Sequence, residues 1–107
     1  MKVLLDECVD EKLRHHLPGH DTQTARYAGF AGLENGELLR EAEAAKFDVL
    51  VTVDRGIEFQ QNLPGRRIAV VVFVGKSVLF EDLLPLMQAC LHHLDSIQPG
   101  QVVRLGG

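Results

Sequence analysis

The sequence predicts a three-layer α/β/α protein with a mainly parallel sheet of four to five strands. Two observations predict it: short apolar runs of strand length recur along the chain, and segments with helical periodicity separate them. A continuous apolar run is typical of a strand buried on both faces, as in a parallel sheet. Alternation of such strands with helices indicates an α/β fold, and we expect one domain over residues 1–107.

Five segments are expected to be strands. Residues 2–6 (KVLLD), 48–53 (DVLVTV) and 68–74 (IAVVVFV) are apolar throughout most of their length, so we expect them to be buried. Residues 20–25 (HDTQTA) are polar for an interior position, which favours an edge strand, and residues 100–105 (GQVVRL) supply a final strand.

Two short helices are expected between these strands. In residues 10–17 (DEKLRHHL), leucines four positions apart share one helix face, and the acidic first turn suits the helix dipole. Residues 55–67 (RGIEFQQNLPGRR) predict a turn and a short helix that ends at a Pro-Gly pair.

Two longer helices are expected. Residues 35–46 (NGELLREAEAAK) carry an apolar stripe, with Asn35 as the expected N-cap. A helical region follows over residues 79–97, where Pro85 is expected to separate a short turn from a main helix that begins near Leu84.

The composition limits the classes of function. The net charge of −4 argues against broad nonspecific binding of nucleic acid, which needs a basic surface, but it allows a nuclease with an acidic, metal-filled centre. No segment has the roughly 20 apolar residues of a membrane span, and the N-terminus is unlike a secretory signal, so we expect a cytoplasmic protein. Cys8 and Cys90 form no zinc pattern and are expected to be small buried residues.

Carboxylates follow two of the expected strands. Asp6 and Glu7 end the first strand, and Asp54 follows the strand that contains VLVTV. In an open α/β sheet, sites form at the carboxyl ends of the strands. Two carboxylates brought together there repel each other unless a proton or a cation lies between them, and Mg²⁺ or Mn²⁺ is the natural cation. Glu37 is the candidate third carboxylate, and Asn35 supplies a neutral oxygen.

Such a metal site could activate water for phosphodiester cleavage. The alternative is that each strand-end Asp only caps the turn that follows it. Arg55 also has two interpretations: it contacts a phosphate group, or it pairs with Asp6 or Glu7 and replaces the metal.

Three consecutive residues with amide side chains lie at positions 60–62, after Arg55. Gln60, Gln61 and Asn62 could contact a base edge or the backbone of a nucleic acid. The simpler interpretation is that these amides cap the turn before the next strand, and the sequence favours it.

Together these motifs resemble those of the PIN-like family of small bacterial proteins, in the DUF5615 or Mut7-C-related group. The resemblance is carried by LLDECVDEKL (residues 4–13) and by residues 19–63, with NGELL followed by T-x-D-R-x-I-x-[FY]-Q-Q-N-L. It implies a PIN-like fold and kinship to the toxin components of bacterial toxin–antitoxin pairs. It also implies a Mg²⁺- or Mn²⁺-dependent ribonuclease with an RNA substrate, an antitoxin-like protein partner and a homodimeric assembly.

The resemblance assigns roles to individual positions. Asp6 matches the first-strand Asp and Asp54 the Asp of the T-x-D element. Asn35 stands where many relatives have an Asp, and Gly56 stands where a second Asp follows in many of them. The leading hypothesis is a toxin-type ribonuclease with Asp6, Asp54 and Glu37 as catalytic metal ligands and with Glu7 and Asn35 as supporting residues. The alternative is a weakly active or inactive binding or regulatory module that acts through a protein partner.

Overall fold

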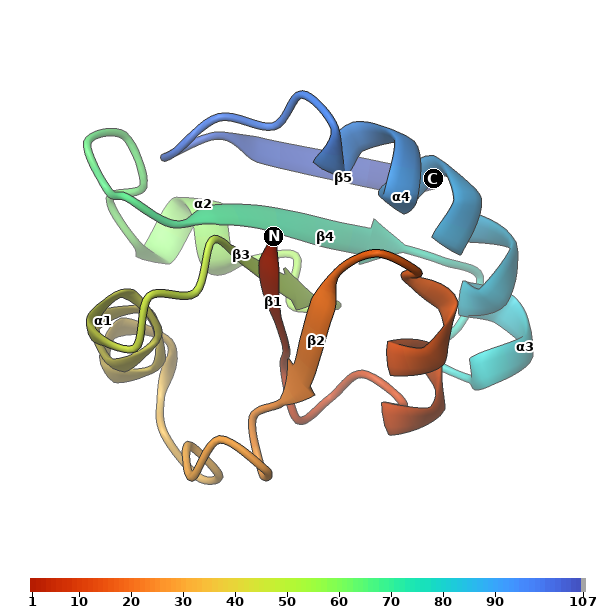
Figure 1. The fold of residues 1–107 in the computed structure, drawn as a ribbon, viewed down its shortest axis with the longest axis horizontal. Helices are drawn as coiled ribbons and strands as arrows, with labels where there is room; N and C mark the ends of the chain where they lie inside the picture. Colours follow the sequence, from red (N-terminus) through yellow and green to blue (C-terminus); the bar gives the residue numbers. More distant parts are fainter. Residues whose placement is uncertain (107) are drawn as a thin grey trace.

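The computed structural model describes residues 1–106 and places their five strands in one sheet with the order β2-β1-β3-β4-β5 (Figure 1). The strands are β1 (Lys2–Leu5), β2 (Asp21–Thr24), β3 (Val49–Thr52), β4 (Ala69–Val74) and β5 (Val102–Gly106). Every pairing is parallel, which confirms the predicted α/β class. The expected edge strand is also confirmed, because within these residues β2 pairs only with β1.

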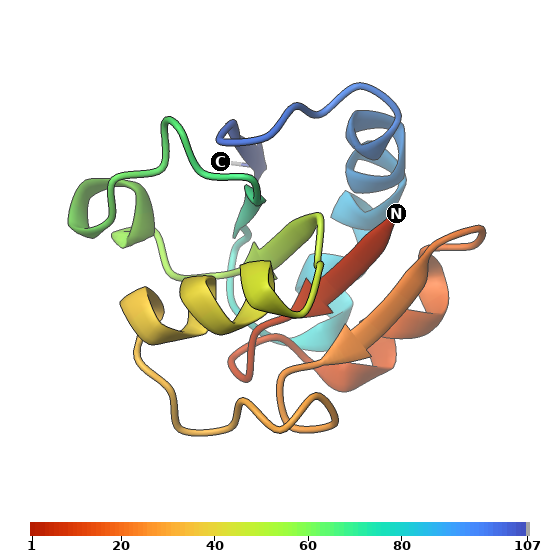
Figure 2. The ribbon, with the colours of Figure 1, turned by 60° about the vertical axis from the view of Figure 1, so that its left-hand side comes forward.

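Helices cover both faces of the sheet, so the protein has three layers. They are η1 (Glu11–His16) and η2 (Leu84–Leu86), which are 3₁₀-helices, and α1 (Asn35–Ala44), α2 (Ile57–Gln60), α3 (Phe80–Leu83) and α4 (Met87–Leu94). The helices α1 and α2 pack on one face, and η1, α3 and α4 pack on the other (Figures 1 and 2). Among residues 1–106, no helix has both the length and the apolar character needed to cross a membrane.

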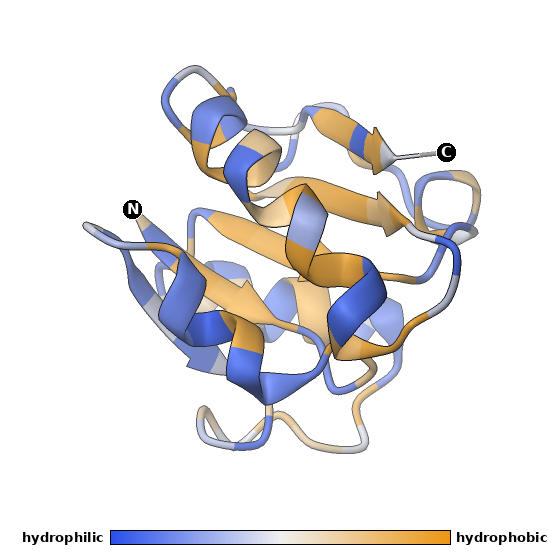
Figure 3. Ribbon diagram, turned by 90° about the vertical axis from the view of Figure 1, so that its right-hand side faces the viewer, coloured by the Kyte–Doolittle hydropathy of each residue, from blue (hydrophilic) through white to orange (hydrophobic). Residues whose placement is uncertain are grey.

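The sheet separates two hydrophobic clusters. Successive side chains of a strand point to opposite faces, so Val3 and Leu5 join the cluster under η1 and α4, whereas Leu4 joins the cluster under α1. The three central strands are apolar on both faces and are coloured as hydrophobic in Figure 3. This double burial explains why their sequences are continuous apolar runs.

Three of the expected helices differ from the structure. The short helix expected to end at the Pro64-Gly65 pair is α2, which already ends at Gln60 because Gln61 is extended. Residues 11–16 form a 3₁₀-helix, which is a tighter helix used in short segments. The main helix of the later region begins at Met87, not near Leu84. Because Pro85 has no backbone N–H to donate, α3 ends at Leu83 and a 3₁₀ turn intervenes before α4.

Glu43 ties the end of α1 to the loop before β4. Its Oε1 lies 2.6 Å from Nη1 of Arg66, and its Oε2 accepts a hydrogen bond of 3.0 Å from the backbone N–H of Arg67. The side chains of Glu43 and Arg66 are only 13% and 23% exposed. Burial acts to raise the pKa of Glu43, but the Arg67 N–H and the Arg66 guanidinium outweigh it and hold that pKa below its ordinary value.

We expect Glu43→Gln to lower the free energy of unfolding by about 1–3 kcal/mol at pH 7, because a charge-assisted pair is lost. A carboxylate whose pKa is lowered by folding stabilises the protein above its unfolded pKa, and this contribution is lost as the pH falls through the folded pKa. The difference from the wild type should therefore shrink as the pH falls below about 4.5.

Urea denaturation at a series of pH values measures this difference. Glu41→Gln is the matched control, since Glu41 is an exposed residue of the same helix. A Glu43→Gln defect that stays constant down to pH 3 would show that the carboxylate charge contributes nothing.

Candidate functional site

The strand register brings the ends of β1 and β3 together. Leu5 is paired with Val51, and the N–H of Asp6 continues this pairing by donating to the carbonyl of Val51 over 2.9 Å. Asp6 therefore lies beside Thr52, and Asp54 follows two residues later. The expectation that both aspartates lie at one edge of the sheet is met.

The hydroxyl of Thr52 connects the two aspartates. Thr52 is fully buried. Its Oγ1 donates to Oδ2 of Asp6 over 2.8 Å and accepts the backbone N–H of Asp54 over 3.1 Å. Sequence reasoning missed this residue, although a hydroxyl inside the otherwise apolar VLVTV was a signal.

Neutral donors contact the other carboxylate oxygens. Oδ1 of Asp6 accepts the N–H of Glu7 over 2.8 Å, and Oδ1 of Asp54 accepts the N–H of Gly56 over 2.9 Å. Oδ2 of Asp54 accepts Nδ2 of Asn35 over 2.7 Å. Each of the four oxygens thus accepts one recorded hydrogen bond, and each has a second lone pair that can bind a cation.

Asn35 has a different role from the predicted one. Glu34 is the N-cap of α1 and makes no side-chain capping bond, while Asn35 is the first residue of the helix. The Asn35 amide is instead engaged with the Asp54 carboxylate, and a hydrogen bond to an ionised group is stronger than a neutral one. This contact fixes the start of α1 against the end of β3.

The two carboxylates have no basic partner. Among residues 1–106, neither Asp6 nor Asp54 takes part in an ion pair. The interpretation that Arg55 replaces a metal is not supported, because its guanidinium reaches the carbonyl of Gly75 over 3.4 Å. No ion pair within the described residues therefore competes with a cation for the two carboxylates.

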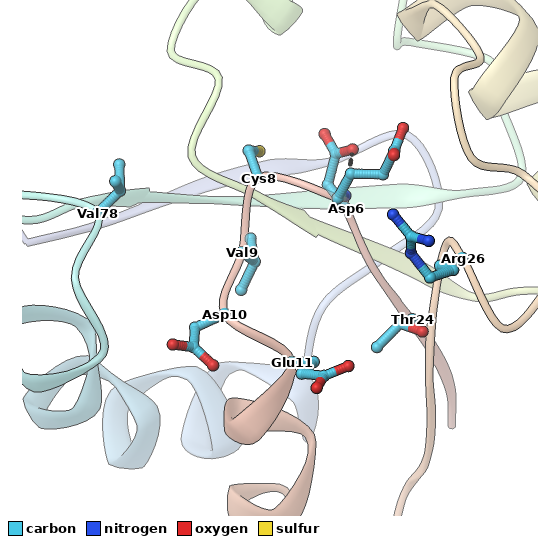
Figure 4. Close-up of a pocket in the computed structure, with 9 residues that line it drawn as sticks. Asp6, Cys8, Val9, Asp10, Glu11, Thr24, Arg26 and Val78 are labelled. Carbon is cyan, nitrogen blue, oxygen red and sulfur yellow. Dashed lines mark hydrogen bonds between the residues drawn. The ribbon is translucent and has the colours of Figure 1, made fainter.

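An open pocket of about 390 Å³ lies beside Asp6. Its lining residues are Asp6, Glu7, Cys8, Val9, Asp10, Glu11, Thr24, Arg26 and Val78. Arg26 is the only basic group of this lining and lies on the same side of the pocket as Asp6 (Figure 4). Glu7, predicted as a supporting residue, accepts the N–H of Gly32 over 2.7 Å and so ties the loop before α1 to this pocket.

The structure does not gather a third carboxylate at the site. Glu37 is an exposed residue in the first turn of α1. In residues 1–106, no three His, Cys, Asp or Glu side chains are grouped closely enough to hold a metal ion. Two carboxylates still fit a loosely held Mg²⁺ or Mn²⁺, because these ions commonly bind one or two carboxylates and complete their shell with water and phosphate oxygens.

The amide side chains at positions 60–62 lie outside the pocket beside Asp6. Gln60 and Gln61 line a second pocket together with Asn35, and Asn62 is exposed. None of these three residues after Arg55 makes a side-chain hydrogen bond within the described chain, so the expected capping of the turn is not observed.

The two cysteines differ. Cys90 is buried as predicted, and burial raises its pKa to about 12. Cys8 is exposed, so its predicted burial is wrong: it lies in the turn after β1, at the pocket wall. Loss of hydration around the sulfur, assisted by the charge of Asp6, raises the pKa of Cys8, and its Sγ lies 3.6 Å from Oγ1 of Thr52. A protonated thiol is a poor nucleophile.

The chain matches no family model, and no curated protein or solved structure is similar to it. The resemblance to PIN-like proteins therefore depends on the quoted motifs. The chemistry of the site follows from its own residues.

We expect Thr52→Val to lower the free energy of unfolding by about 1–3 kcal/mol, because the Asp54 N–H and the Asp6 carboxylate lose a buried partner. Thr52→Ser keeps the hydroxyl and is the matched control, so the difference between the two variants isolates the hydrogen bonds. Chemical denaturation measures both. A valine variant that is as stable as the serine variant would contradict the bridging role of the hydroxyl.

Proposed function

We propose that this protein is a PIN-like, toxin-type ribonuclease that hydrolyses RNA phosphodiester bonds with a divalent cation held by Asp6 and Asp54. The observation that carries the proposal is that Thr52 joins the Asp6 carboxylate to the Asp54 backbone at neighbouring strand ends, while neither carboxylate forms an ion pair within residues 1–106. Like charges held close together favour the uptake of a cation between them. Mg²⁺ and Mn²⁺ suit this oxygen-only pair.

A bound cation would activate a water molecule and offset the charge that develops on the phosphate. The chain's own residues supply the rest. Asp6 and Asp54 hold the cation, while Thr52 and Asn35 fix the orientation of the two carboxylates through the hydrogen bonds described above. Arg26, which lines the same pocket as Asp6, would contact a phosphate oxygen of the RNA.

The missing third carboxylate supports a second candidate function. A PIN-like binding or regulatory module with little catalysis would act through a protein partner, either an antitoxin-like protein or a second copy of the chain. Tyr27 and Phe59, which are 81% and 79% exposed, are the large side chains most available for such a contact. Aromatic side chains are enriched at protein interfaces.

Titration of Mn²⁺ into the metal-free protein tests the first proposal. We expect one Mn²⁺ site in the wild type and an affinity at least about tenfold weaker in Asp54→Asn. Loss of a residue that only orients a metal ligand lowers metal affinity about tenfold or more, and loss of the ligand itself should lower it at least as much. Hydrolysis of RNA should be lost in the same variant. Isothermal titration calorimetry and an RNA cleavage assay measure the two effects.

Glu37→Gln is the matched control for this titration. Because Glu37 forms no metal-binding group with Asp6 and Asp54, the Glu37→Gln protein should bind Mn²⁺ with the affinity of the wild type. Loss of binding in Glu37→Gln would show that the ligand set is wrong. An Asp54→Asn protein that cleaves RNA at the wild-type rate would refute the catalytic role, and a wild type that binds no Mn²⁺ would favour the binding module.

A further inference from the structure

A second pocket, of about 310 Å³, is lined by Asn35, the residue that donates to the Asp54 carboxylate. The start of α1 and the end of α2 form its walls, through Glu34, Asn35, Gly36, Gln60 and Gln61. Its volume is at the lower end of the range for small-molecule sites. The metal proposal leaves four of these five residues without a role.

Two adjacent glutamines each lie over a glycine. A Cβ atom added to Gly36 would lie 3.4 Å from Oε1 of Gln61, and one added to Gly56 would lie 3.1 Å from Nε2 of Gln60. Neither glycine has the positive φ that favours glycine, and Gly56 has a φ of −85°. The backbone conformation therefore does not require glycine at these positions. An added Cβ would be tight against the Gln60 amide at Gly56 and in ordinary van der Waals contact with the Gln61 amide at Gly36, so both amides lie directly against these glycines.

The lining has the hydrogen-bonding character of a site for a neutral polar ligand. It contains no cationic side chain, which argues against a phosphate as the occupant. A glutamine amide presents a donor and an acceptor in one plane. Within residues 1–106 the side chains of Gln60 and Gln61 make no hydrogen bond, so both groups of each amide are available to a ligand.

A nucleobase is the ligand that matches these amides. Its edge carries donors and acceptors in one plane, and Asn and Gln pair with such edges in two-point contacts. Single-stranded RNA exposes these edges to a protein. The pocket also adjoins the proposed phosphodiester site, because Asn35 lines it and donates to Oδ2 of Asp54.

We propose that this pocket binds a nucleobase of the RNA next to the phosphodiester held at Asp6 and Asp54. The identity of the larger ligand as RNA rests on the proposed function. The base contact itself needs neither a metal nor catalysis. It can therefore be tested on its own with nucleosides, which carry no phosphate.

The test is a titration of the metal-free, ¹⁵N-labelled protein with adenosine, cytidine or uridine, followed by NMR. We expect at least one nucleoside to shift the side-chain amide signals of Gln60 and Gln61 and the backbone signal of Gly36, with saturation. Ribose and inorganic phosphate, added separately, should not shift them. Shifts of equal size with either control would overturn the proposal, since they would indicate a sugar or anion site.

Two variants locate the contact. Gln61→Ala removes an amide, and Gly36→Ala places a methyl group against that amide, so each should weaken nucleoside binding by about tenfold. Alanine is the better helix former, so Gly36→Ala should retain the thermal stability of the wild type and its loss of binding cannot come from unfolding. Gln88→Ala, an exposed position of α4 on the opposite face of the sheet, should bind like the wild type.

Absence of any saturable shift, or shifts that survive both Gln61→Ala and Gly36→Ala, would refute the base pocket. Those results would leave the metal proposal intact, because no metal is added in this titration. Conversely, nucleoside binding in a protein that takes up no Mn²⁺ would refute the metal proposal and retain the pocket.

Discussion

The buried hydroxyl of Thr52 is the interaction on which the candidate site depends. It holds the Asp6 carboxylate and the Asp54 backbone at the ends of two neighbouring strands. The pairing of the two strands alone would fix both backbones, but the Asp6 side chain could still adopt several rotamers. The hydroxyl removes that freedom, and because it is fully buried, breaking its bonds leaves polar groups without water.

Asn35 extends the same network to the helical layer. Its amide joins the first residue of α1 to Asp54, so the start of that helix is positioned by the site and not by a capping side chain. The same contact places Gly36 where Gln61 can lie over it. Through Asn35 the Asp54 carboxylate is thereby connected to the amide-lined pocket between α1 and α2, while Asp6 lines the acidic pocket.

The fold could be predicted from the sequence because the central strands are buried on both faces and carry continuous apolar runs. The meeting of Asp6 and Asp54 followed from the same strands, once they were neighbours. The position of Glu37 could not be predicted from its closeness to Asn35 in the sequence. It lies two residues after Asn35, and two residues turn an α-helix by about 200°, so a helix whose Asn35 faces Asp54 directs Glu37 away from it.

Arg55 and Thr52 show the corresponding limits at the strand end. Arg55 is adjacent to Asp54 in sequence, yet its guanidinium reaches Gly75, beyond the end of β4. Thr52 interrupts the apolar run VLVTV, but threonine is a common strand former, so the hydroxyl indicates a particular role only when its partners are known. Both cases concern side-chain direction, which depends on the register of neighbouring strands more than on local sequence.

The acidic charge of the chain is compatible with an RNA ligand if charge and recognition are divided between the two pockets. A net charge of −4 cannot supply the broad phosphate neutralisation that basic proteins use. A divalent cation between Asp6 and Asp54 would instead neutralise the two carboxylates and offer coordination positions to one phosphate. Uncharged amides beside it would add affinity that does not require a basic surface. Ligand binding at such a site would depend on the contacts of one nucleotide, and the absence of a positive surface would itself limit binding to other nucleic acids.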